Sequence, residues 1–392
     1  MISILAVIYI VFISLGLPDS LFGVAWPVVH VDFGVAESFA SSYSIITGIC
    51  TGGSSFVAGR LLRKFGTPNV TFVSILMTVA GLIGTSFSNN IWVMMFFSVV
   101  LGYGAGAIDT GLNDYVSNHY EARHMNWLHC FWGIGVTASP MIMSMFLTGE
   151  SGSWRMGYRV VAAIQLFIAT IVLFSLKKWK SYDDRSIYIK NEEESSEKVR
   201  IFSIKGVPTS ILSLGFYCSM EFTIGTWGAT YIVNTLALSP DVAAKWVSVY
   251  FGGIMLGRLV AGFVSMKAND NFLIRCGLAI SCVGFVILAL PIGTASLCGF
   301  GLIGFGFGPV FPSVLHSVPS RFGSKLSADI TGFHMGGAYG VGFAMQLSFG
   351  YLASATTFKI MPYVLMGFCA LAILMNETTI AKLKKLQKTN ND

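Results

Sequence analysis

Long apolar stretches of close to twenty residues alternate with short polar gaps along almost the whole chain. A transmembrane helix needs about 20 mostly apolar residues, so each stretch predicts one membrane-spanning helix. No charged segment precedes the first stretch and no small-residue cleavage site closes it, so we expect a helix of the mature protein and not a signal peptide. The twelve predicted spans are 2–29, 38–62, 69–87, 91–117, 125–147, 157–176, 206–235, 242–265, 272–292, 295–318, 328–353 and 359–376.

One polar segment is much longer than the other gaps. It runs over 177–205 and mixes basic residues with Asp183-Asp184 and Glu192-Glu193-Glu194. This composition favours a solvated cytoplasmic linker, with a regulatory or partner-binding segment as the alternative. The predicted organisation is therefore a six-helix bundle over 1–176, the linker over 177–205, a second six-helix bundle over 206–378 and a cytoplasmic tail over 379–392.

The composition excludes most soluble classes of protein. Hydrophobic residues make up 54% of the chain and charged residues 11%, with a mean hydropathy of +0.69. Soluble domains carry about 25% charged residues, so this deficit indicates a membrane protein. The seven cysteines are scattered through apolar stretches without a CxxC pair, which predicts no metal or redox site. The net charge of +6 does not indicate a nucleic-acid partner, because the basic residues gather in the gaps between spans.

Lysine and arginine are distributed unevenly between alternate gaps. If both termini lie on one side, that side holds 21 of the 25 basic residues, and the other holds only Arg155, Arg159, Lys245 and Lys359. Cytoplasmic loops carry the excess of Lys and Arg in membrane proteins. Both termini are therefore predicted in the cytoplasm, for a protein of the bacterial inner membrane or the plasma membrane.

The two halves of the chain share motifs in the same order. Residues 102–106 (GYGAG) match 304–308 (GFGFG) at an offset of 202, and Leu128-His129 matches Phe333-His334 at an offset of 205. A Gly-Gly pair followed by Gly-Arg recurs as well, ending at Arg60 and at Arg258. Such ordered matches predict two parallel six-helix repeats, the arrangement of a transporter with its binding site at the repeat interface.

Ionisable residues inside the predicted spans are few and concentrate on particular helices. A charge in the bilayer core costs roughly 3 kcal/mol or more unless it faces protein or water, so each such residue is a candidate functional residue. They are Asp19, Asp109, Asp114, His129, Glu221, His316 and His334. The helices that carry them are expected to line a cavity.

Asp109 belongs to a stripe of Gly102, Gly106, Asp109 and Asn113, whose spacings of four, three and four place them on one helix face. Glycines allow a backbone or a ligand to approach closely, and the carboxylate and amide suit a polyhydroxylated substrate. The alternative is helix packing through small residues, with Asp109 bonded to a neighbouring helix. Asp114 points elsewhere and is predicted as a gating or coupling residue, or as a structural partner of a loop cation.

Glu221 lies well inside the apolar span at 211–233. Such surroundings disfavour the charged form of a carboxylate, which makes Glu221 the first candidate for ion coupling by proton transfer. A carboxylate that is only hydrogen-bonded across helices is the alternative. Trp227 and Tyr231 share a face at i, i+4 and could stack on the apolar face of a sugar ring. Membrane interfaces are also rich in such aromatic residues.

Asp19 is surrounded by Pro18, Gly16, Gly23 and Pro27. Proline and glycine around a carboxylate predict a locally broken helix with freed backbone groups, and Asp19 is a second candidate for ion coupling.

His129 shares a stripe with Asn126 and Trp132, and could donate to substrate hydroxyls or to a carboxylate. A proton relay and a purely structural histidine are the alternatives. Asn126 and His334 are further candidates for substrate binding, and His316 is another candidate histidine.

Motifs of enzymes are missing from the sequence. It has no GxSxG nucleophile elbow, no HExxH motif and no P-loop lysine, and its GxGxG runs lie inside apolar spans. The sequence therefore predicts neither an enzyme nor a pump driven by its own nucleotide site, and no cofactor.

Taken together, these residues resemble the major facilitator superfamily and, within it, the fucose–galactose–glucose:proton symporter family. The resemblance covers nearly the whole chain. It rests on 16–27, the Asp109-Thr110-Gly111-Leu112-Asn113 run, 128–135 (LHCFWGIG), Glu221 with Gly225, Trp227 and Tyr231, and 306–312.

The resemblance implies a monomer in which two helical bundles alternate around a central site. Asp19 and Asp109 match acidic positions that serve proton coupling and sugar recognition in the fucose permease, which has glutamate at the second position. The run at 128–135 looks more like the animal sodium-dependent glucose carriers, which leaves H⁺ or Na⁺ open. In the loop motif at 59–66, Arg63 stands where the superfamily has aspartate. Arg60, Arg63, Arg258 and Asp114 are the candidate gating residues.

We therefore expect a cation-coupled symporter, most simply H⁺-coupled, for a neutral sugar or sugar-like polyol. The alternative is a proton-coupled efflux antiporter for amphiphilic compounds, which the many aromatic residues and 17 methionines favour. A sensor or lipid-handling protein on the same fold is a third possibility.

Overall fold

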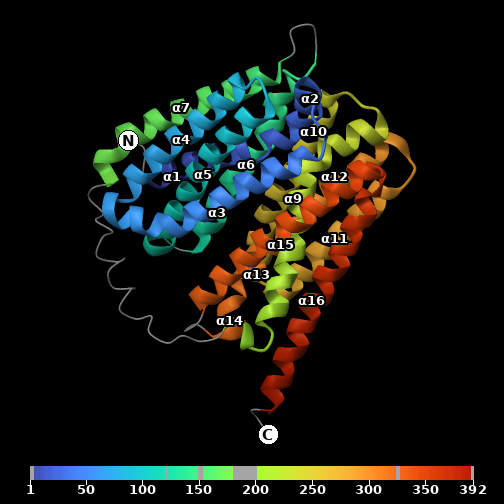
Figure 1. Ribbon diagram of the computed structural model, residues 1–392. Helices are drawn as coiled ribbons and strands as arrows, with labels where there is room; N and C mark the ends of the chain where they lie inside the picture. Colours follow the sequence, from blue (N-terminus) through green and yellow to red (C-terminus); the bar gives the residue numbers. More distant parts are fainter. Residues whose placement is uncertain (1–3, 121, 149–152, 180–200, 324–326, 390–392) are drawn as a thin grey trace. The chain divides into compact units, whose positions relative to one another are not determined.

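The computed structural model describes residues 4–120, 122–148, 153–179, 201–323 and 327–389, and the side chains of some helical residues within these ranges are also outside it. The chain separates into two compact units (Figure 1). Unit 1 comprises Met1–Glu197 with Ala237–Ser248, and unit 2 comprises Lys198–Leu236 with Val249–Asp392. The predicted linker is helical up to Trp179, and its residues 180–200 lie outside the described residues.

The described residues are almost entirely helical and form no strand. The helices before the linker are α1 (Ile4–Asp19), α2 (Leu21–Phe33), α3 (Phe39–Phe65), α4 (Thr67–Phe87), α5 (Ile91–His119), α6 (Ala122–Ser144) and α7 (Trp154–Trp179). After it come η1 (Ile201–Ser203), α9 (Val207–Leu236), α10 (Pro240–Val264), α11 (Asp270–Ala289), η2 (Gly293–Leu297), α12 (Cys298–Phe307), α13 (Val310–His316), α14 (Val318–Phe322), α15 (Ser327–Ala355), η3 (Phe358–Ile360) and α16 (Met361–Thr389).

Each predicted span falls on one of these helices or on a run of consecutive helices. The break predicted near Asp19 is limited to one residue, because α1 ends at Asp19, α2 begins at Leu21, and Ser20 between them keeps a right-handed helical conformation. A second break separates α12 from α13 at Gly308 and Pro309. The helix α16 continues to Thr389, so the segment predicted as a tail from residue 379 prolongs the last helix.

Eight helical segments in the described part are long and apolar enough to cross a membrane. They correspond to α1 with α2, α4, α5, α7, α10, α11, α12 with α13, and α16. The other predicted spans fall on α3, α6, α9 and α15. Of these, α3, α9 and α15 are rich in glycine, serine and threonine, which are the residues that allow close packing between helices in a membrane.

The glycines of α5 lie directly against its two neighbours within unit 1. A Cβ atom added to Gly102 would lie 2.5 Å from the carbonyl oxygen of Thr47 on α3, and one added to Gly104 would lie 2.7 Å from that of Ser74 on α4. Gly106 is equally close to α3, at Thr51. The glycines therefore hold α3, α4 and α5 in backbone contact.

Unit 2 repeats this arrangement at the positions that the sequence matches predict. Gly304 lies against the carbonyl of Tyr250 and Gly308 against Arg258, both on α10, while a Cβ atom on Gly306 would lie 2.5 Å from the carbonyl oxygen of Gly277 on α11. In both units the outer glycines contact one neighbouring helix and the central glycine contacts another. The internal repeat is thus present in the packing as well as in the sequence.

A buried glutamine joins three helices of unit 1. Gln165 of α7 is 1% exposed. Its Oε1 accepts hydrogen bonds from Ser14 Oγ at 2.8 Å and Thr78 Oγ1 at 3.0 Å, and its Nε2 donates to the carbonyl of Ser14 at 2.7 Å. Hydrogen bonds of this kind hold α1, α4 and α7 together where no water can replace them.

Replacing this glutamine tests its role in stability. Gln165→Leu keeps most of the side-chain volume but leaves the Ser14 hydroxyl without its acceptor, so we expect a loss of about 2 kcal/mol in the free energy of unfolding. Thermal unfolding of the purified protein in detergent measures it. Thr170→Ala is the control, because Thr170 is exposed on the same helix and donates to the carbonyl of Phe167 within that helix. Equal stability of Gln165→Leu and the control would contradict this role.

Candidate functional site

Asp19 is held at the break between α1 and α2. Its side chain is exposed, and its Oδ2 accepts a hydrogen bond of 2.7 Å from Trp132 Nε1 on α6. The two helices cross closely at reciprocal glycines: Gly16 lies against the carbonyl of Trp132, and Gly135 lies against the carbonyl of Ile13. This crossing places the Asp19 carboxylate beside α6, where one oxygen is held by the indole.

Asp109 is half-buried on α5 and pairs with Asn113 one turn further on. Asn113 Nδ2 donates to Asp109 Oδ1 at 2.7 Å and to the Asp109 carbonyl at 2.9 Å. The bond orients both side chains on one face of the helix. Gly102 and Gly106 of the same stripe face α3 and not a ligand, so the packing interpretation holds for the glycines of this stripe.

His129 lies on α6, half-buried, with its ring edge-on to Phe12 of α1 at a centroid distance of 5.9 Å. Between one and two turns earlier, His124 Nδ1 is 2.8 Å from the hydroxyl of Tyr9, which also stacks on Phe131 at 4.6 Å. The α1–α6 contact therefore contains both histidines and the Asp19–Trp132 bond. The Tyr9–His124 pair carries no local sequence signal, because its members are far apart in the chain.

Glu221 is half-buried on α9 of unit 2. It lies close enough to Tyr217 and Tyr250 for its charge to act on both hydroxyls, and Arg258 of α10 acts on the same two groups. Tyr217 donates to the carbonyl of Phe307 at 3.2 Å. The carboxylate and the guanidinium therefore share the surroundings of two fully buried tyrosines.

Trp227 and Tyr231 lie in the interior of unit 2. Trp227 is 0% exposed and packs against Phe358 at a centroid distance of 5.5 Å. Tyr231 is 5% exposed, and its hydroxyl is 3.4 Å from the carbonyl of Leu288. Protein side chains cover both rings in this state of the molecule. Their use as a stacking surface for a sugar stays a prediction.

His334 is fully buried between α15 and α9. Its Nδ1 is 2.9 Å from the carbonyl of Ile330 and its Nε2 is 2.8 Å from Ser210 Oγ. Since a carbonyl can only accept, Nδ1 donates and Nε2 accepts from the serine, which satisfies a neutral imidazole. On the same two helices, Gln346 Nε2 donates to Thr226 Oγ1 at 2.8 Å.

Four predicted site residues cannot be placed at the level of side chains. Arg60, Arg63, Asp114 and Asn126 sit on α3, α5 and α6, and their side chains lie outside the described residues. The remaining predicted gating residue, Arg258, is half-buried on α10 beside the close contact with Gly308.

Several ion pairs join two helices of the same unit. In unit 2, Arg275 Nε of α11 donates to Glu377 Oε1 of α16 at 2.7 Å, and His316 Nδ1 is 3.0 Å from Asp270 Oδ2. In unit 1, Arg155 binds Asp32 at 2.6 Å. Within the described chain, no group of three His, Cys, Asp or Glu residues could hold a metal ion.

Two parallel repeats, many apolar spans and carboxylates on apolar helices are typical of membrane transporters. A family model of the Major Facilitator Superfamily matches residues 8–347, and the chain belongs to this superfamily. The superfamily and the all-helical fold predicted from the sequence are confirmed. Family members are transporters, which agrees with the prediction that the protein is not an enzyme.

Two curated relatives and one solved structure are similar to the chain. The glucose/mannose transporter GlcP of Bacillus subtilis (strain 168) is 22% identical over 280 residues, which cover 69% of this chain and 67% of that protein. A putative glucose/galactose transporter of Helicobacter pylori (strain ATCC 700392 / 26695) is 24% identical over 307 residues, covering 72% and 73%. The structure of a D-xylose-proton symporter aligns over 95% of this chain and 96% of that chain with a TM-score of 0.74 at 12% identity, so it has the same fold.

Proposed function

We propose that the protein is a secondary active transporter that moves a neutral sugar or sugar-like polyol across the membrane together with a cation, most simply H⁺. The substrate class is supported above all by the two relatives whose names identify them as glucose transporters and which align with about two thirds or more of the chain. Cation coupling is supported by the carboxylates Asp19, Asp109 and Glu221, since carboxylates on membrane-spanning helices serve proton relays in transporters.

The carboxylates have separate roles in this proposal because they stand in different surroundings. Asp109 with Asn113 presents an acceptor and an amide on one face of α5, which suits hydroxyl groups of a sugar. Glu221 and Asp19 carry the coupling ion. His129, Asn126 and His334 assist substrate binding, as do Trp227 and Tyr231 once the bundle rearranges. Arg60, Arg63, Arg258 and Asp114 act at the gates.

The membrane potential supplies enough energy for accumulation. One positive charge that enters with a neutral sugar at 100 mV contributes about 2.3 kcal/mol, which corresponds to roughly fifty-fold accumulation. The proposed location is the bacterial inner membrane or the plasma membrane with both termini in the cytoplasm, as the distribution of Lys and Arg favours. The protein works as a monomer in this proposal.

Substrate counterflow tests the proposed substrate class. Proteoliposomes loaded with an unlabelled sugar should take up the same sugar in radiolabelled form, for at least one of glucose, galactose, mannose, fucose and xylose. Asp109→Asn should raise the half-saturating concentration by about tenfold, because a charged hydrogen-bond acceptor is lost. Protein-free liposomes are the control. Failure of every sugar to exchange, together with extrusion of a lipophilic cation, would establish the efflux antiporter instead.

Coupling is tested separately at Glu221. Glu221→Gln cannot release a proton, so ion-driven accumulation of sugar should fall to the level of equilibration while counterflow continues, because exchange needs no net deprotonation. Asp241→Asn is the matched control, since Asp241 is a carboxylate at the start of α10 that forms an ion pair with Lys245. If Glu221→Gln accumulates sugar as the wild type does, the coupling role moves to Asp19.

A further inference from the structure

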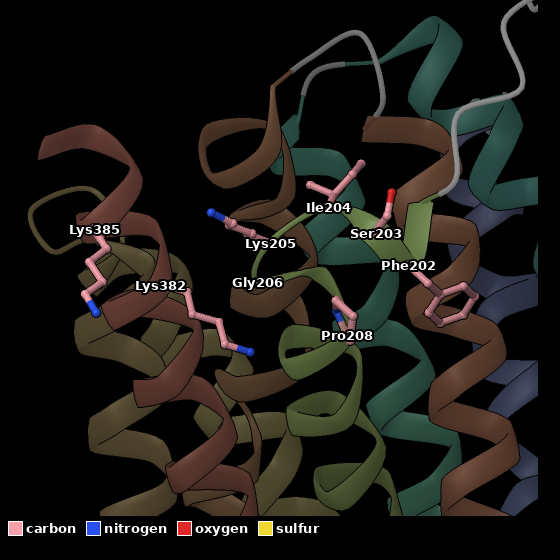
Figure 2. Close-up of a pocket in the computed structure, with 8 residues that line it drawn as sticks. All are labelled: Phe202, Ser203, Ile204, Lys205, Gly206, Pro208, Lys382 and Lys385. Carbon is pink, nitrogen blue, oxygen red and sulfur yellow. The ribbon is translucent and has the colours of Figure 1, made fainter. Parts of the chain in front are cut away.

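One cavity in the described chain is lined by residues outside the proposed transport site. It has a volume of about 530 Å³ and opens at the end of unit 2 between η1, the start of α9 and the last turns of α16 (Figure 2). Its lining residues are Phe202, Ser203, Ile204, Lys205, Gly206, Pro208, Lys382 and Lys385. We refer to it as the lysine pocket.

Specific packing fixes the walls of this pocket. Gly206 has φ +93, a conformation that favours glycine, and it turns the chain from η1 into α9. A Cβ atom built on Gly206 would lie 3.6 Å from Leu383 of α16. One turn before Leu383 on α16, Thr379 Oγ1 donates to Thr209 Oγ1 of α9 at 2.8 Å. These contacts hold α16 against the start of α9, so the two walls of the pocket keep their spacing.

The pocket carries positive charge on both walls. Figure 2 shows Lys205 and Lys382 reaching into the space between α16 and the turn at Gly206, with Lys385 further along α16. No carboxylate is among the described lining residues. The start of α9 adds the partial positive charge of a helix N-terminus. Such an arrangement attracts an anion larger than a single chloride.

The surroundings favour a lipid as the source of that anion. The segment Phe358–Lys385, which contains most of α16, is long and apolar enough to cross a membrane. Lys382 and Lys385 therefore stand at the end of a helix that is long and apolar enough to span a membrane, where phospholipid headgroups are expected. Phe202 is 60% exposed at the rim and Ile204 and Pro208 line the wall, which gives the pocket apolar surface beside its charges.

We propose that the lysine pocket binds the headgroup of an anionic phospholipid, such as phosphatidylglycerol. The phosphate accepts hydrogen bonds from Lys205 and Lys382, Lys385 adds charge at the rim, and Phe202 and Ile204 contact the glycerol and the first acyl carbons. The lipid ties α16 to the start of α9. This inference is independent of the transported substrate, because none of the lining residues belongs to the proposed transport site.

Native mass spectrometry of the purified full chain in detergent tests the proposal with two lipids of equal chain length. The apparent dissociation constant for phosphatidylglycerol should be lower than that for phosphatidylcholine. In Lys205→Gln/Lys382→Gln it should rise by about tenfold or more, because each lysine near a headgroup contributes on the order of a factor of five. Lys384→Gln is the control, since Lys384 is exposed on α16 outside the pocket lining and should leave the constant unchanged.

A variant that keeps the charge and a competition with free phosphate decide whether the two lysines form a lipid site. Lys205→Arg/Lys382→Arg keeps the charge and should retain phosphatidylglycerol binding, and thermal unfolding confirms that each variant is folded. Equal binding of the two lipids, or an unchanged constant in the double glutamine variant, would refute the proposal. The last experiment is competition between inorganic phosphate and the lipid. If free phosphate at equal concentration displaces phosphatidylglycerol completely, the pocket is a phosphate site and not a lipid site.

Discussion

Backbone contact between helices at glycine is the constraint on which the rest of this structure depends. Lipid tails are as apolar as leucine, so helices in a membrane gain little from hydrophobic burial and associate through close packing. Gly16 and Gly135 bring α1 onto α6, and Asp19 follows Gly16 by less than one turn. Gly106 fixes α5 on α3 in the same way, with Asp109 less than one turn further on. A Cβ atom at these glycines would meet backbone atoms, so side chains at these crossings would move the carboxylates.

Polar side chains supply the second constraint, because each one inside the spans needs a partner from the protein. Gln165 meets this need by bonding two other helices, and His334 does so with Ser210 and a carbonyl of its own helix. These bonds leave the polar atoms involved with partners inside the protein. Asp19 differs from them, since its side chain is exposed while Trp132 holds one carboxylate oxygen. That combination of exposure and orientation is what a coupling or binding carboxylate requires.

The parts of the fold that have a local or periodic sequence signal could be predicted from the sequence. The length of the apolar stretches predicted the spans, and Pro18 with Gly16 predicted the interruption beside Asp19. The matched glycines predicted a repeat, and their contacts recur in both units. The sequence could not predict the Gln165 cluster, because Ser14, Thr78 and Gln165 are distant in the chain and each looks ordinary alone. Spacing placed Trp227 and Tyr231 on one helix face but could not say which neighbour covers that face. The sequence did not predict the lysine pocket either, because Lys205 and Lys382 line one cavity only through the packing of α16 on α9.

The central claim is that sugar and proton move together through a protein whose carboxylates are set by helix packing. The most direct test is to measure whether addition of sugar drives protons into proteoliposomes. The protein is reconstituted in lightly buffered proteoliposomes with a potassium permeability that balances charge, and sugar is added outside while the external pH is followed. The account predicts that protons enter with the sugar, so the medium becomes more alkaline, and that a protonophore abolishes the change. Sugar exchange without any change in external pH would contradict proton coupling.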